Sequence, residues 1–259
     1  MIVIKSPREI SLMREAGRVV AVVFEKIKPY MVPGVSTKTI SDMVEKIMEE
    51  EGAISAEKGY GGYPEYACVS VNEVLVHGIP SDRKILKDGD IVSLDIVAKK
   101  NGYMGDACRT YPIGICGERQ LRMIHIAETC FFEGVRLIRP GVHLGDIQHR
   151  IQEVATSYGV KVAREFTGHG IGSHMHEDPV IPNYGEKGSG PVLAEGMTLA
   201  IEPMILEGKG ELRILKDGWT AVSKDGKLTA HYENTIVVTK DGYDILTMLE
   251  EEKIRRKLV

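Results

Sequence analysis

The sequence predicts a mixed α/β domain of the α+β type, in which helices are followed by antiparallel strands in each of two related halves. Three observations lead to this prediction: an amphipathic helix with clear capping residues, a segment pair that recurs at one spacing, and a tight turn signal between two apolar strands. We expect one domain over residues 1–259, with pseudo-symmetric halves at about 1–120 and 121–250.

The first helix is indicated by its capping residues. Ser6 can cap the helix, Pro7 fits its first turn, and Glu9 completes a capping box. Apolar residues then recur at roughly helical spacing as far as Pro29.

A second helix, expected from about Thr37 to Glu51, belongs to a segment that recurs later in the chain. Residues 33–52 align with 140–159 at an offset of 107, with Pro-Gly-Val at the start and glycine at the end of both. The same offset aligns 89–95 with 196–202, and each of these strands ends in a carboxylate. Two amphipathic helices can align by chance, but the strand match at the same offset favours a duplicated unit. The buried face of the second helix should carry Ile40, Val44, Ile47 and Met48.

Asn101-Gly102 is a strong signal for a two-residue hairpin turn. A turn this tight pairs residue 95 with 108, so Asp95 and Asp106 become diagonal neighbours on one face, roughly 7–8 Å apart at the backbone. Two carboxylates this close raise each other's pKa unless a cation lies between them. A solvated pair on an exposed face is the alternative, and the apolar residues around Asp95 disfavour it.

The second half offers a comparable pair of carboxylates. Glu202 takes the place of Asp95 in the repeat, and Glu233 takes that of Asp106 on a later strand. Two divalent cations would neutralise four such carboxylates. A carboxylate-rich site with an imidazole suits Mn, Fe, Co or Zn, and such ions can assist hydrolysis. A metal-binding protein without enzyme activity remains an alternative.

Composition argues against several other classes of protein. The net charge of −4 gives no electrostatic argument for nucleic acid or an anionic membrane. The aliphatic run from Val19 to Phe24 is too short to span a bilayer, and the charged N-terminus does not resemble a signal peptide. The four cysteines contain no C-x-x-C pair, so we expect a reduced, cytoplasmic protein.

Five residues in order resemble the metal ligands of the methionine aminopeptidases: Asp95, Asp106, His169, Glu202 and Glu233. The strings NEVLVHGIP, GDIVSLDI, GDACRT, GHGIG, MTLAIEP and YENTIVVT are also similar to that family, and the resemblance runs from about residue 4 to 248. It implies the pita-bread fold, whose internal pseudo-twofold symmetry agrees with the repeat. Type I members are the better match, because the chain lacks the large second-half insertion of type II enzymes.

The resemblance implies two divalent metal ions, with Co, Mn, Fe or Zn as candidates. His169 and Glu202 would hold one ion, Asp95 would chelate the other, and Asp106 and Glu233 would bridge both. Glu202 would also accept the proton of the attacking water.

The resemblance further implies that His77 and His176 lie beside the scissile peptide. His176 would stabilise the developing oxyanion, and His77 would contact the amide nitrogen. The substrate-binding residues would be Tyr60, Tyr63, Cys68, His77, Met175, His176 and Trp219. A thioether side chain fits an aromatic, sulfur-containing pocket of this kind.

Some positions depart from the family pattern or have simpler explanations. Met175 stands where bacterial members carry phenylalanine, and Glu57 falls near a position that is often cysteine, so we leave Glu57 out of the pocket. Cys68 could be an ordinary core residue, and Trp219 a surface residue that caps the fold. In the tract TGHGIGSHMHEDP (167–179) we expect His174 to be an exposed loop residue. Solvated or locally hydrogen-bonded side chains are expected for His125, His143, His149 and His231, although His231 shares a face with Glu233 if its strand is regular.

The activity implied is removal of the initiator methionine from nascent polypeptides with a small second residue. The partners would be nascent N-termini and the ribosome, for a monomeric protein that needs neither nucleic acid nor a membrane. Two alternatives remain: an X-Pro aminopeptidase or dipeptidase of the same fold, and a pita-bread binding protein without catalysis. The first usually carries a long additional N-terminal domain, and the second typically loses metal ligands.

Overall fold

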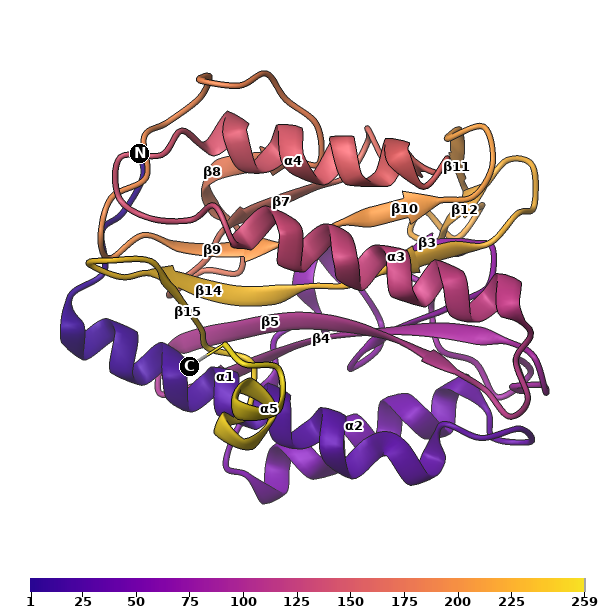
Figure 1. The fold of residues 1–259 in the computed structure, drawn as a ribbon. Coiled ribbons are helices and arrows are strands. Elements are labelled where there is room, and N and C mark those ends of the chain that lie inside the picture. The colour runs from indigo at the N-terminus through magenta and orange to yellow at the C-terminus, as the bar shows by residue number, and fades with distance from the viewer. Residues whose placement is uncertain (259) are drawn as a thin grey trace.

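The sheets lie between two pairs of helices (Figure 1). In this computed structural model, which describes residues 1–258, α1 and α2 pack against one side of the sheets and α3 and α4 against the other. The helices are α1 (Pro7–Ile27), α2 (Thr37–Glu50), α3 (Glu118–Val135), α4 (Leu144–Ser157) and α5 (Glu250–Arg255). No helix among the described residues combines the length and apolar character needed to cross a membrane.

The strands are short except for one long hairpin. They are β1 (Ile54–Ser55), β2 (Cys68–Val71), β3 (Val74–Val76), β4 (Ile91–Lys100), β5 (Tyr103–Pro112), β6 (Lys161–Val162), β7 (Thr167–Gly170), β8 (Glu177–Pro182), β9 (Thr198–Ile201), β10 (Met204–Leu206), β11 (Leu212–Ile214), β12 (Ala221–Ser223), β13 (Thr229–His231), β14 (Asn234–Val238) and β15 (Tyr243–Ile245). One sheet has the order β1-β4-β2 with β5 beside β4, and another has the order β15-β14-β9-β7-β8. Two three-stranded sheets, β13-β10-β6 and β11-β12-β3, complete the layer.

The predicted helix starts are confirmed. The Ser6 side chain accepts from the Glu9 N–H, and the Glu9 carboxylate accepts from the Ser6 N–H at 2.8 Å. Ser36 caps α2 through a bond from the Thr39 N–H at 3.0 Å, and the predicted apolar face of that helix is buried. α2 ends at Glu50, one residue earlier than expected.

The predicted hairpin is also confirmed, together with its register. Asn101 and Gly102 adopt φ values of 50° and 84°, which a two-residue turn of this type requires. Asp95 pairs with Cys108, and Val97 pairs with Asp106. Asp95 and Asp106 therefore lie diagonally across β4 and β5.

The two halves of the chain meet where β5 runs beside β14. Thr235 donates through its hydroxyl to the Asp106 carbonyl at 2.9 Å and accepts from the Asp106 N–H at 2.9 Å. The Glu233 N–H donates to the Cys108 carbonyl at 3.0 Å. These bonds bring Asp106 and Glu233 close together in the structure, although 126 residues separate them in the chain. The division into halves at about 120 remains a prediction.

The N-terminal residues hold the loop between β7 and β8. The Lys5 N–H donates to the Gly196 carbonyl at 2.9 Å, and the Lys5 ammonium pairs with Glu177 at 2.5 Å. Both side chains of this pair are nearly excluded from solvent, so the bond is far less screened than a surface ion pair. Glu177 directly follows His176, and the pair therefore fixes one end of the histidine tract.

Candidate active site

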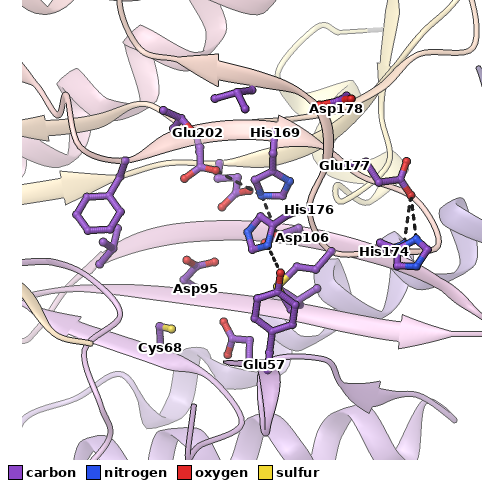
Figure 2. A pocket seen from close by; sticks show the side chains of 18 of the residues that line it. Glu57, Cys68, Asp95, Asp106, His169, His174, His176, Glu177, Asp178 and Glu202 are labelled. Atoms are coloured by element: carbon purple, nitrogen blue, oxygen red, sulfur yellow. Dashed lines mark hydrogen bonds and ion pairs between the residues drawn. The ribbon is translucent and has the colours of Figure 1, made fainter. Parts of the chain in front are cut away.

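A cavity of about 850 Å³ opens between the two main sheets and contains every predicted site residue. The lining includes Tyr60, Tyr63, Cys68, His77, Asp95, Asp106, His169, Met175, His176, Glu202, Trp219 and Glu233. Figure 2 shows the carboxylates and imidazoles pointing toward one another from opposite walls. The structure thus brings these residues together, while their individual roles remain predictions.

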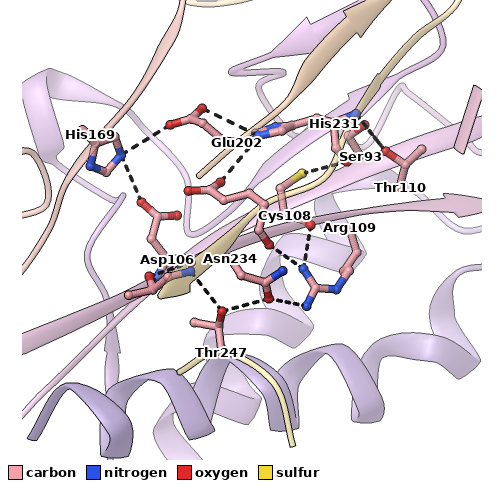
Figure 3. Close-up of polar contacts among 12 residues, drawn as sticks. Ser93, Asp106, Cys108, Arg109, Thr110, His169, Glu202, His231, Asn234 and Thr247 are labelled. Carbon is pink, nitrogen blue, oxygen red and sulfur yellow. Dashed lines mark hydrogen bonds and ion pairs between the residues drawn. The ribbon is translucent and has the colours of Figure 1, made fainter. Parts of the chain in front are cut away.

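The strands place the potential ligand atoms within a few ångströms of one another. The His169 Nε2 lies 3.6 Å from Asp106 Oδ2 and 3.6 Å from Glu202 Oε1 (Figure 3). Asp106, His169 and Glu233 each offer one ligand atom within a sphere of 4.8 Å, and so do Glu202, His231 and Glu233. A third group consists of Asp95, Cys108 and His231, and shared residues join the three groups into one continuous cluster of potential ligands.

Two observations show that the donor set suits cations. Asp95 Oδ1 and Glu233 Oε1 are buried oxygens without a hydrogen-bond partner, which is costly unless something else binds them. His169 Nδ1 lies 2.9 Å from the Gly170 carbonyl, an arrangement that leaves Nε2 free to face the cluster. Carboxylate oxygens with one imidazole are a donor set that divalent first-row metals accept.

Burial and mutual repulsion set the electrostatics of the cluster. Burial raises the pKa of Glu202 and Glu233 well above the ordinary glutamate value, and the Asp106 charge adds to this effect. Burial, followed by the Asp95 charge, raises the pKa of Asp106, and burial raises the pKa of Asp95 to about 7. Without a cation, these carboxyl groups lose their protons less readily than ordinary ones; a bound cation would favour their ionised form.

Aromatic and imidazole rings form the rest of the cavity wall. The Tyr60 hydroxyl lies 2.6 Å from His176 Nδ1, and the His176 ring centroid lies 4.3 Å from that of His169. Trp219 meets the ring of Tyr63 edge-on at 5.2 Å and that of His77 at 6.0 Å. One end of the cavity is therefore aromatic, and the other is occupied by the carboxylates.

Four predictions about histidines that are not site residues are confirmed. The His174 side chain is 83% exposed and points away from the carboxylates toward Glu177 (Figure 2). His125, His143 and His149 have local partners in Thr129, the Gly190 carbonyl and the Gly185 carbonyl.

Two other predictions are wrong. His231 is neither solvated nor locally bonded through its ring: it is 1% exposed, both ring nitrogens lack a partner, and Nε2 lies 3.5 Å from Glu233 Oε2 and 3.7 Å from Glu202 Oε2. The reason is that the ring lies on the cluster side of β13, enclosed beside Glu202 and Glu233, while Ala230 on the opposite face of the strand packs into the core with α3. The sequence feature that could have indicated this burial is the position of His231 two residues before Glu233. Glu57, which we left out of the pocket, is buried and lines the cavity.

The position of His231 predicts an effect on metal binding. Because its imidazole contacts two carboxylates of the cluster, we expect His231→Ala to weaken the binding of Mn²⁺ by roughly 10- to 100-fold. Isothermal titration calorimetry on metal-free protein measures this directly. His125→Ala, on the exposed face of α3, serves as the matched control and should leave the affinity unchanged. Equal affinities for wild type and His231→Ala would show that the buried ring does not support the ligands.

A cavity between antiparallel sheets, walled by clustered carboxylates and imidazoles, defines a metal-dependent hydrolase as the class of this protein. Comparison with known proteins agrees with this class. The sequence matches metallopeptidase family M24 over residues 11–240. It is 47% identical to methionine aminopeptidase 1 of Bacillus subtilis, over 95% of this chain and 99% of that protein. It is 45% identical to methionine aminopeptidase of Escherichia coli, over 97% of this chain and 96% of that protein.

Solved structures give the same result. The fold matches the crystal structure of methionine aminopeptidase from Thermotoga maritima with a TM-score of 0.95 at 45% identity, covering 96% of this chain and 100% of that one. The prolidase of Pyrococcus furiosus matches with a TM-score of 0.76 at 25% identity, and only 66% of that chain is covered. The chain belongs to metallopeptidase family M24, and within it to the methionine aminopeptidases. The pita-bread fold predicted from the sequence is confirmed, as is the use of divalent metal that this family implies.

Proposed function

We propose that this protein removes the initiator methionine from nascent polypeptides whose second residue is small. The observation that supports this most is the geometry of the cavity described above, which combines five potential ligand residues, two further histidines and an aromatic wall. The whole-length similarity to methionine aminopeptidases supports the same activity.

The metal centre that we propose contains two divalent ions, with Mn, Co, Fe or Zn as candidates. His169 and Glu202 would hold one ion, Asp95 would hold the other, and Asp106 and Glu233 would contribute to both. Ions bound there would polarise the substrate carbonyl and make water more acidic. Glu202, whose pKa burial raises, would accept the proton of the attacking water.

The two cavity histidines act as neutral imidazoles. Burial lowers the pKa of His77 to about 4 and also lowers the pKa of His176, so neither ring is charged near neutral pH. In the tautomer that we propose, the Tyr60 hydroxyl donates to Nδ1, and the His176 proton on Nε2 would donate to the developing oxyanion. His77 sits at φ 57° and directs its ring between Phe166 and Trp219, where it contacts the substrate amide.

The aromatic end of the cavity holds the methionine side chain. Tyr63, Trp219 and Cys68 give it flat, polarisable walls, which suit a thioether. Met175, buried among other apolar residues, forms a further part of the wall. The substrate class also leads us to propose nascent N-termini at the ribosome as partners of a monomeric cytoplasmic enzyme.

A peptide assay tests the proposed function. We expect purified protein supplied with Mn²⁺, Co²⁺ or Fe²⁺ to release methionine from Met-Ala-Ser, and to act far less on Met-Lys-Ser because the second residue is large. Free methionine is measured by chromatography, with metal-free protein as the control. No release from Met-Ala-Ser with any of the three metals would contradict the proposal. Cleavage of X-Pro peptides in its place would favour the prolidase-like alternative.

A further inference from the structure

Lys5 is a buried lysine in the cavity wall that the proposed mechanism does not use. Its side chain is 4% exposed, and its ammonium group lies 2.5 Å from the carboxylate of Glu177, whose side chain is 11% exposed. The Lys5 N–H also donates to the Gly196 carbonyl at 2.9 Å, so both the backbone and the side chain of Lys5 are fixed. Each charge of such a pair depends on the other, because an unpaired charge is costly to bury.

The Glu177 carboxylate closes the turn that presents His176. One of its oxygens accepts from the Lys5 ammonium group, and the other accepts from the His174 N–H at 3.2 Å. In Figure 2 this carboxylate points away from the carboxylate cluster, whereas the His176 ring faces His169. The ion pair therefore holds the backbone of the turn and leaves the His176 ring to face the cavity.

Gly172 makes room for the ion pair beside the turn. A Cβ atom at this position would lie 2.5 Å from Lys5 Cε and 2.6 Å from Glu177 Oε1, so a side chain there would push the pair apart. The Gly172 N–H donates to the His174 carbonyl at 3.1 Å, and its own carbonyl accepts from the Met104 N–H at 2.9 Å. The turn, the ion pair and β5 are thus packed as one unit.

His176 stands between two anchored neighbours. Met175 before it is 6% exposed and packs in an apolar cluster, and Glu177 after it is bound by Lys5. The His176 Nδ1 lies 2.6 Å from the Tyr60 hydroxyl, and this position of the ring depends on both neighbours. Loss of the Lys5 charge would leave the Glu177 carboxylate buried without its cation, so the carboxylate would turn toward water and displace the turn.

We propose that Lys5 is a positioning residue, which acts through Glu177 to keep His176 where it can donate to the developing oxyanion. This inference rests on the proposed function, because it acts through the role proposed there for His176. Removal of one oxyanion donor costs about 100- to 1,000-fold in kcat, and a misplacement of about 1 Å can cost about 100-fold. Loss of Lys5 should therefore lower kcat by less than loss of the His176 ring itself.

The test compares Lys5→Met with wild type on Mn²⁺-loaded protein, with Met-Ala-Ser as the substrate. We expect kcat to fall by roughly 10- to 100-fold and KM to stay within about 2-fold. The affinity for Mn²⁺, measured by calorimetry on metal-free protein, should be unchanged. In the His176→Ala background the same substitution should lower kcat by less than about 2-fold, because the ring that Lys5 positions is then absent. A purely structural contribution would lower kcat by the same factor in both backgrounds.

Lys253→Met is the matched control. The Lys253 side chain is also 4% exposed and pairs with Asp244 at 2.7 Å, but it belongs to α5 and does not line the cavity. Both substitutions remove one partner of a buried ion pair, so both should lower the urea concentration at the midpoint of unfolding. Only Lys5→Met should lower kcat.

Glu177→Gln is the second variant, for use if Lys5→Met fails to fold. It removes the ion pair, keeps the shape of the side chain and retains an oxygen that can accept from the His174 N–H. We expect a smaller fall in kcat than for Lys5→Met, and this fall should also disappear in the His176→Ala background.

Several results would overturn the proposal. They are a wild-type kcat in the folded Lys5 or Glu177 variant, an equal loss in the His176→Ala background, and an equal loss in Lys253→Met. Weaker Mn²⁺ binding by Lys5→Met would also overturn it, because the effect would then act through the metal ligands. If wild type released no methionine, the proposed function would fall and the inference with it, whereas an active wild type matched by Lys5→Met would overturn the inference alone.

Discussion

His169→Ala is expected to lose most metal binding and to cleave Met-Ala-Ser at least about 100-fold more slowly than wild type. Mutation of a residue that only hydrogen-bonds to a metal ligand already lowers metal affinity or activity by about 10- to 100-fold, and loss of a ligand itself should cost more. His169 is the imidazole placed between Asp106 and Glu202, with Nε2 at 3.6 Å from an oxygen of each. Alanine would leave those carboxylates without a nitrogen donor and would open space in a wall that is otherwise buried. Calorimetric titration with Mn²⁺ measures the affinity, and methionine release measures the rate.

His174→Ala is the matched control from the same tract. Its side chain is 83% exposed, and Nδ1 lies 3.9 Å from Glu177, so its removal disturbs no part of the cluster. We expect metal affinity and activity within about 2-fold of wild type, since surface substitutions usually have small effects. Equal losses in the two variants would mean that the tract binds metal as a unit, contrary to the division that the structure shows between a buried and an exposed imidazole.

The parts of the site that follow from local rules were predictable from the sequence. Asn101-Gly102 sets a two-residue turn, and the turn sets the register that places Asp95 and Asp106 on one face. Ser6 and Ser36 start their helices for equally local reasons. In these cases a few neighbouring residues decide the geometry, and distant packing does not change it.

The parts that depend on how distant strands meet were not predictable in this way. Periodicity shows that His231 shares a face with Glu233, but not that this face is buried within the carboxylate cluster. Glu57 stands in an irregular segment where no period applies, and burial of an acidic residue is uncommon. The bonds between Asp106 and Thr235 close the cluster, and nothing local in either strand specifies that contact. The resemblance to a known family supplied the ligand set that these local rules leave open.

The same carboxylates give metal-free protein an unusual dependence of stability on pH. Asp95, Asp106, Glu202 and Glu233 have folded-state pKa values above their unfolded values, so the folded protein binds more protons than the unfolded chain once the pH exceeds about 4. The free energy of unfolding therefore falls as pH rises toward the folded-state values. Buried His169 and His231 act in the opposite direction below pH 6.5, because only the unfolded chain takes up their protons. Above that pH these histidines no longer oppose the carboxylate effect.

Removal of metal should therefore destabilise the protein most at alkaline pH. Each carboxyl group that stays protonated in the folded state lowers the free energy of unfolding by about 1.4 kcal/mol per pH unit, so we expect the stability of metal-free protein to fall between pH 6.5 and 8.5. Urea unfolding of EDTA-dialysed protein across this range measures the slope. Protein loaded with Mn²⁺ should show a shallow or reversed slope, because cations replace the protons and bind more tightly once the ligands are deprotonated. Asp106→Asn, which removes one carboxyl group from the cluster, should flatten the metal-free slope. Parallel slopes with and without Mn²⁺ would mean that the buried carboxylates are not where the metal binds, since only a cation at those oxygens removes their preference for protons.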